Sequence, residues 1–196
     1  MIEQEIFPTL ILEDNLNLNV KAMNDYAYET RKKGHIRDNS NIGGQHPINV
    51  DLEEPVLQPL IKYITKMSYV YSKKLLIDKK YVLAIVSMWF IINNHRDYII
   101  LHTHPGAYLS GVFYSRASVG CGKLVFKNPN PRLESYWRPK YFRMNTPCND
   151  AVSYVKPQTN GIIMFPSWLE HYVEHNENKE DRIAWSFNLE LKQEDK

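Results

Sequence analysis

The chain has 196 residues, of which 43% are hydrophobic and 23% charged, and its net charge is only +2. This size allows one domain with a substantial core, and the weak charge does not indicate nucleic-acid binding. No uninterrupted apolar run approaches the length of a membrane span, and the acidic N-terminus predicts no signal peptide. The two cysteines, Cys121 and Cys148, follow no metal-binding or redox spacing, so we expect a cytoplasmic protein.

The first 80 residues are expected to be mostly helical. Asp51 is a candidate helix cap and Pro55 suits a first helical turn. The expected elements are an edge strand at 5–12, an amphipathic helix at 19–33, a polar loop at 34–49 and a longer helix that continues to Leu75. The loop serves either as surface filler or as the rim of a site. Because no linker follows, we predict a single domain, 1–196, with helices packed on the remainder.

From residue 81 onward the apolar residues alternate with a period of two, which is typical of strands. Many short strands that follow helices favour an antiparallel jelly roll with the helices on one sheet, and 81–192 would form this core. The irregular stretch 130–150 holds Trp137, and its tyrosines near 136–142, which are Tyr136 and Tyr141, either line a substrate channel or cover a sheet face. The predicted strands are 81–92, 98–104, 110–115, 123–126, 151–155, 162–165, 169–174 and 182–191.

Three histidines are candidates for a metal site. His102 and His104 lie two residues apart in an expected strand, and alternate residues of a strand share a face. His171 begins a later strand. If the two strands lie side by side, three neutral imidazoles converge on one point, which suits iron or zinc. His-x-His alone is a weak signal, because a histidine in a strand is more often an ordinary core or surface residue, and the later His171 strengthens it.

Arg182 enters an aromatic strand after a polar turn. An arginine that faces an apolar interior is costly unless it is paired with an anion, and a bidentate contact with a carboxylate satisfies it. The alternative is a surface arginine at the start of a strand.

Several segments occur in a characteristic order. They are His102-Thr103-His104-Pro105, 109–114, 122–126, 128–129, 160–173 and 182–188, with 40–45 before them. With these segments the chain resembles the iron(II)- and 2-oxoglutarate-dependent oxygenases common in bacteria and phages, which are distantly similar to prolyl hydroxylases. The resemblance spans about residues 38–190 and is most specific at 165–171.

The resemblance implies a double-stranded β-helix in which His102 and His171 are catalytic iron ligands. Arg182 would bind the distal carboxylate of the co-substrate 2-oxoglutarate. The wider superfamily has a carboxylate where this chain has His104, so His104 either completes a three-histidine site or turns away and leaves water as a ligand. The candidates around the co-substrate and the imidazoles are Tyr114, Trp185, Ser186 and Asn188, and His175 is expected at the rim.

The implied activity is that of a dioxygenase, in which oxidative decarboxylation of 2-oxoglutarate is coupled to hydroxylation of an unidentified substrate by dioxygen. The main alternative is a non-catalytic, cupin-like binding module with three histidines, which would not need Arg182. A zinc hydrolase would need a general base, and Glu170 is expected on the opposite strand face from His171. A homodimer is compatible with the sequence, which leaves the oligomeric state open.

Overall fold

The computed structural model describes residues 2, 6–33, 48–130, 132, 142–144, 146 and 149–194. Most of the predicted polar loop, with the segment 40–45, lies outside these residues. Tyr136, Trp137, Tyr141 and Cys148 lie outside them as well.

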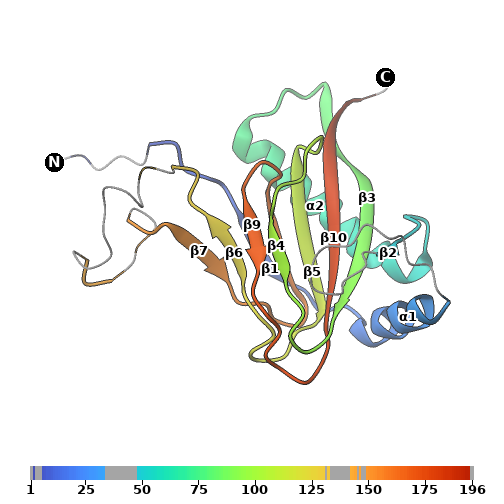
Figure 1. The fold of residues 1–196 in the computed structure, drawn as a ribbon. Coiled ribbons are helices and arrows are strands. Elements are labelled where there is room, and N and C mark those ends of the chain that lie inside the picture. Colours follow the sequence, from blue (N-terminus) through green and yellow to red (C-terminus); the bar gives the residue numbers. More distant parts are fainter. Residues whose placement is uncertain are drawn as a thin grey trace.

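Two antiparallel sheets face one another, which confirms the predicted jelly roll (Figure 1). The large sheet contains, in spatial order, β1 (Leu12–Asn15), β8 (Gly161–Pro166), β5 (Leu109–Arg116), β10 (Arg182–Gln193), β3 (Tyr81–Asn93) and β2 (Ile48–Asn49). The small sheet contains β4 (Ile99–His102), β9 (His171–Val173), β6 (Leu124–Lys127) and β7 (Val152–Val155).

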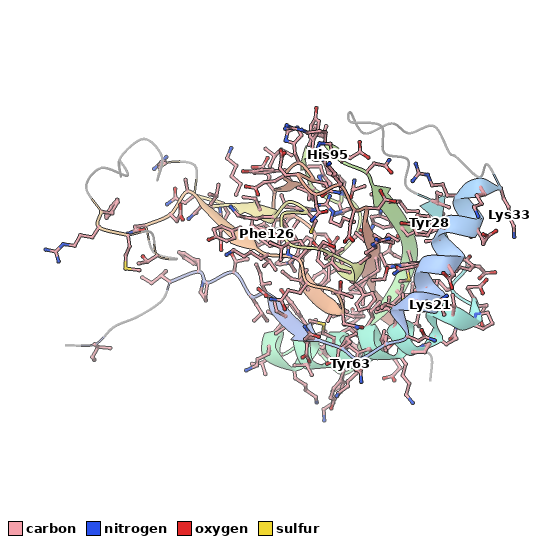
Figure 2. All side chains as sticks on the ribbon, turned by 90° about the horizontal axis from the view of Figure 1, so that it is seen from below. Lys21, Tyr28, Lys33, Tyr63, His95 and Phe126 are labelled. Carbon is pink, nitrogen blue, oxygen red and sulfur yellow. The ribbon has the colours of Figure 1, made fainter. Side chains whose placement is uncertain are left out.

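The helices cover the outer face of the large sheet, as predicted (Figure 1). They are α1 (Val20–Lys32), a short 3-10 turn, η1 (Pro55–Leu57), and α2 (Gln58–Leu75). In Figure 2, Lys21 and Lys33 mark the two ends of α1 beside the sheet. The helices and the outer side chains of the sheet form one core, which includes Leu60, Ile64, Phe113, Trp185 and Phe187.

A second core lies between the two sheets and includes Val112, Phe126, Phe165 and Val173. Alternation along β10 separates the two cores, because successive strand residues point to opposite faces. Its odd-numbered residues, such as Trp185, pack toward the helices, whereas Arg182, Ala184 and Ser186 line a cavity between the sheets.

Two predictions in the N-terminal part are wrong. The first strand begins only at Leu12, where the chain pairs with Met164 of β8. Asp51 does not cap the long helix: its carboxylate accepts from Glu53 N in a turn, and Pro55 then opens η1.

Among the described residues, no helix has the length and apolar character needed to span a membrane.

Candidate metal and co-substrate site

His102 and His171 are directly opposite each other on β4 and β9, and their ring centroids are 4.3 Å apart. The Nδ1 atoms lie 2.8 Å and 2.7 Å from the carbonyl oxygens of Ile100 and Leu169, respectively. Because a carbonyl can only accept, each Nδ1 carries the proton and donates it. Each Nε2 therefore keeps a free lone pair, which is the arrangement usual for a metal-binding histidine.

His104 reaches the same place by a different route from the one the sequence suggested. β4 ends at His102, so the prediction of a strand that continues to His104 is wrong. His104 is followed by Pro105, which removes a backbone donor, and Gly106 turns the chain with a φ of +89°. The backbone N of His104 donates to Ser167 O at 3.0 Å. Its imidazole Nε2 nevertheless lies 3.3 Å from Nε2 of His171.

The three imidazoles form the sole group of three or more potential metal ligands found among the described residues. Each offers one ligand atom, and these atoms lie within 4.8 Å of one another. Burial lowers the pKa of His104 to about 4 and that of His171 to about 3, and it lowers the pKa of His102 as well. All three are therefore neutral near pH 7, the protonation state that a metal ion requires.

The cavity between the sheets has a volume of about 410 Å³. It is mostly apolar, and Arg182 is the only formally charged side chain among its described lining residues. The lining also includes the three histidines together with Ser87, Trp89, Ile91, Asn93, Val112, Tyr114, Leu124, Phe165, Val173, Ala184 and Ser186.

Arg182 is buried, with 1% of its surface exposed. It is the first residue of β10 and pairs with Asn93, the last residue of β3. Its Nη1 donates to Cys121 O at 2.6 Å, and its Nε and Nη2 donate to Asn93 Oδ1. Burial lowers the pKa of the guanidinium, with Asp97 acting in the opposite direction, yet arginine stays charged in proteins. No described carboxylate forms an ion pair with it.

Gly122 belongs to the turn whose backbone carbonyls, those of Cys121 and Gly122, accept hydrogen bonds from Arg182. Its φ is +87°, and a Cβ at this position would collide with the backbone carbonyl of Glu174. Glycine is therefore required here, both for the conformation and for the space. The Gly122 carbonyl itself lies 3.5 Å from Nη1 of Arg182.

The other predicted site residues divide into two groups. Tyr114 and Ser186 line the cavity together with Arg182. Trp185 does not, because it is one position out of phase on β10; it faces the helices and donates to Ser115 Oγ. The exposed His175 packs against Tyr98 outside the described cavity lining.

Asn188 also lies outside the described lining of the cavity. Its Oδ1 accepts from Ser110 Oγ at 2.8 Å, and Ser110 Oγ is 2.8 Å from Ser167 Oγ. Since Ser110 donates its one proton to Asn188, Ser167 donates to Ser110. The Ser167 carbonyl accepts from His104, so this buried series supports the turn that carries the third imidazole.

The sequence reasoning missed Asn93, Ser110 and Ser167 as parts of the site. The predicted strand 81–92 stops one residue short of Asn93, which is the last residue of β3 in the structure. A polar residue at the end of a buried strand was the available signal, since such a residue needs a partner.

Comparison with known proteins agrees with this geometry. The family model described as "Putative 2OG-Fe(II) oxygenase" matches residues 87–188, which is 102 of the 196 residues and runs from β3 into β10. No curated protein sequence matches the chain.

Solved structures share the fold at low sequence identity. A prolyl-4-hydroxylase from Pseudomonas putida is 12% identical, with a TM-score of 0.67 over 93% of this chain and 92% of that one. A viral collagen prolyl hydroxylase from Paramecium Bursaria Chlorella virus-1, in its 2-oxoglutarate complex, is 17% identical, with a TM-score of 0.58 over 92% and 96%. A Trichoplax adhaerens prolyl hydroxylase is 13% identical, with a TM-score of 0.60 over 91% and 82%. These likenesses confirm the double-stranded β-helix, and the matched family model shows that the chain belongs to the 2-oxoglutarate- and iron(II)-dependent oxygenases.

Proposed function

We propose that the chain is an iron(II)- and 2-oxoglutarate-dependent dioxygenase of the hydroxylase type, with iron bound by His102, His104 and His171. We propose further that Arg182 binds the distal carboxylate of 2-oxoglutarate. The observation that carries the proposal is that a buried cation, with which no described carboxylate forms an ion pair, lines the same cavity as three neutral imidazoles. A metal ion and a dicarboxylate together would satisfy both features.

The residues present fit a divalent metal ion. Two ligands at right angles around one ion, each about 2.1 Å from it, lie about 3 Å apart. The 3.3 Å between Nε2 of His104 and Nε2 of His171 is close to that separation. Three histidines differ from the usual two histidines and one carboxylate, so the site lacks one negative charge.

Bound iron(II) and 2-oxoglutarate would supply the chemistry that splits dioxygen, converts the co-substrate to succinate and carbon dioxide, and hydroxylates a C–H bond. The contribution of the chain is positional. The Ile100 and Leu169 carbonyls fix the orientation of two imidazoles. Arg182 would hold the far end of the co-substrate so that its other end reaches the histidines. Apolar side chains such as Ile91 and Phe165 keep water from the cavity.

A zinc hydrolase is less compatible with the cavity. Such an enzyme needs a general base close to the metal. Glu170 is exposed, and no Asp or Glu occurs among the described lining residues.

The decisive experiment is an anaerobic titration of the iron(II)-loaded protein with 2-oxoglutarate. We expect a weak visible metal-to-ligand charge-transfer band. The matched control is His95→Ala, which removes an exposed histidine outside the described cavity lining and should leave the band unchanged. A folded wild-type protein that binds iron but develops no band would contradict the proposal.

We propose that the whole chain folds as one domain located in the cytoplasm. The single domain is supported by the core that the helices share with the large sheet. Limited proteolysis should therefore yield no stable fragment that consists of the sheets alone. The location is supported by the free, buried thiol of Cys121.

A further inference from the structure

Asn93 lies beside Arg182 and has no assigned role. It is fully buried, with 0% of its surface exposed, and it lines the cavity. Because β3 and β10 pair antiparallel, the two residues are direct cross-strand partners. Asn93 Oδ1 accepts from Nε and Nη2 of Arg182 at 3.1 Å and 2.7 Å.

The amide of Asn93 can have only one orientation. If it were turned over, its NH₂ group would face the donors of the guanidinium, and two donors cannot bond to each other. The Nδ2 atom must therefore be the one that does not contact Arg182. This atom is buried and, within the described part of the chain, has no hydrogen-bond partner. An orphaned buried donor is uncommon in a folded protein and calls for a missing acceptor.

The guanidinium of Arg182 also has a donor to spare. Its bonds to Asn93, Cys121 and Gly122 use Nε–H, one hydrogen on Nη2 and those on Nη1. Since a guanidinium has five N–H groups, one hydrogen on Nη2 has no acceptor among the described residues. Nη2 bonds to Oδ1 of the Asn93 amide, so the two spare donors belong to side chains in direct contact.

The neutrality of Asn93 matters as much as its position. An aspartate in the same place would accept the same two bonds and would also cancel the charge of Arg182. Asparagine orients the guanidinium and leaves its charge available to a ligand. The backbone carbonyl of Asn93 bonds to Asn176 Nδ2, and this contact does not depend on the side chain.

We propose that Asn93 determines specificity for a dicarboxylate co-substrate: it orients Arg182 without neutralising it and donates Nδ2 to the distal carboxylate. This inference rests on the proposed role of Arg182 in binding that carboxylate. A merely structural role predicts instead that Asn93→Leu, which leaves the charge of Arg182 in place, keeps the preference for 2-oxoglutarate.

The test uses the full chain loaded with manganese(II), which binds such sites without turnover, and calorimetry with 2-oxoglutarate and 2-oxopentanoate. The second ligand lacks the distal carboxylate. For Asn93→Asp we expect affinity for 2-oxoglutarate to fall at least about 30-fold, since the pocket loses both its charge and a donor. Affinity for 2-oxopentanoate should stay within about threefold, and the melting temperature of the metal-free variant should not fall. Asn19→Asp adds the same charge at the exposed N-cap of α1, outside the described cavity lining, where aspartate caps a helix as well as asparagine does, and this variant should bind both ligands like the wild type.

Each outcome decides a different claim. If the manganese-loaded wild type does not prefer 2-oxoglutarate, the proposed function itself fails. If the wild type prefers it and Arg182→Met loses the preference while Asn93→Asp keeps it, only the role of Asn93 is overturned. An equal loss for both ligands in Asn93→Asp also overturns that role. Should Asn93→Asp not fold, Asn93→Leu removes the donor without adding charge, and an unchanged preference there contradicts the inference.

Discussion

The two ends of the cavity solve opposite electrostatic problems. At one end, three imidazoles have pKa values lowered by burial and carry no charge until a metal ion arrives. At the other end, Arg182 carries a permanent buried charge, and no carboxylate in the described part of the chain forms an ion pair with it. The histidine end is assembled from the small sheet and the turn after β4, whereas the arginine end is a cross-strand pair in the large sheet.

Because the two ends differ in charge and belong to different sheets, they should be separable by mutation. Under the proposed function, the histidine end binds a cation and the arginine end binds an anion. Substitutions at the histidines should therefore change metal affinity, and substitutions at the arginine should change co-substrate affinity.

The largest effect is expected for His171→Ala. His171 faces both other histidines and is the most buried of the three, so its loss should abolish metal binding, with affinity reduced by more than about 1,000-fold. Anaerobic calorimetry with iron(II) measures this, with circular dichroism to confirm folding. His95→Ala should bind iron like the wild type. If His171→Ala still binds iron like the wild type, the three histidines are not the iron site.

Arg182→Met should affect the opposite end. We expect affinity for 2-oxoglutarate to fall about 100- to 1,000-fold, because a buried charge-assisted contact is lost, while affinity for iron(II) stays within about threefold. Calorimetry of the metal-loaded variant measures the first quantity and titration of the metal-free variant the second. Arg116→Met is the matched control, because Arg116 contacts Tyr28 and Glu180 outside the described cavity lining. Equal losses of metal and co-substrate affinity would contradict separable ends.

Much of the fold could be predicted from the sequence because its strongest patterns coincide with its largest elements. Apolar residues spaced three and four positions apart before Leu75 predicted α2, and apolar residues at alternate positions predicted β3 and β10. β2 was missed, because two residues carry no periodicity. The N-terminal strand was misplaced, because its position depends on pairing with β8, a contact distant in sequence.

The residue types that line the cavity are visible in the sequence, but their connections are not. Arg182 and Ser186 share the cavity face of β10, and alternation along this strand could have excluded Trp185. The approach of His104 depends on its bond to Ser167, which local sequence cannot reveal. Asn93 could not be paired with Arg182 without the register of β3 against β10.

His104→Ala should have an intermediate effect confined to the metal end. His104 lies on a turn rather than in a strand, and two better-fixed imidazoles remain, so we expect affinity for iron(II) to fall about 10- to 100-fold. His175→Ala, at an exposed position outside the described cavity lining, should have no effect. Unaltered iron affinity in His104→Ala, measured by the same calorimetry, would favour a site with two protein ligands and water.

The smallest effect is a pH dependence that only the histidine end should show. Well above pH 6.5 the imidazoles are neutral in both the folded and the unfolded metal-free chain. Their protonation therefore does not lower the unfolding free energy in that range. Below that pH the unfolded chain takes up protons, whereas His104 and His171 do not until about pH 4 and 3, so stability falls as the pH is lowered through this window. Between pH 7 and pH 6 we expect these two residues to cost about 1 kcal/mol of unfolding free energy, measurable by urea denaturation. Arg182 stays charged throughout and adds no slope. The His104→Gln/His171→Gln double variant should lose this part of the dependence of unfolding free energy on pH, whereas Arg182→Met should keep it. If the double variant shows the same pH dependence as the wild type, other groups cause the acid sensitivity.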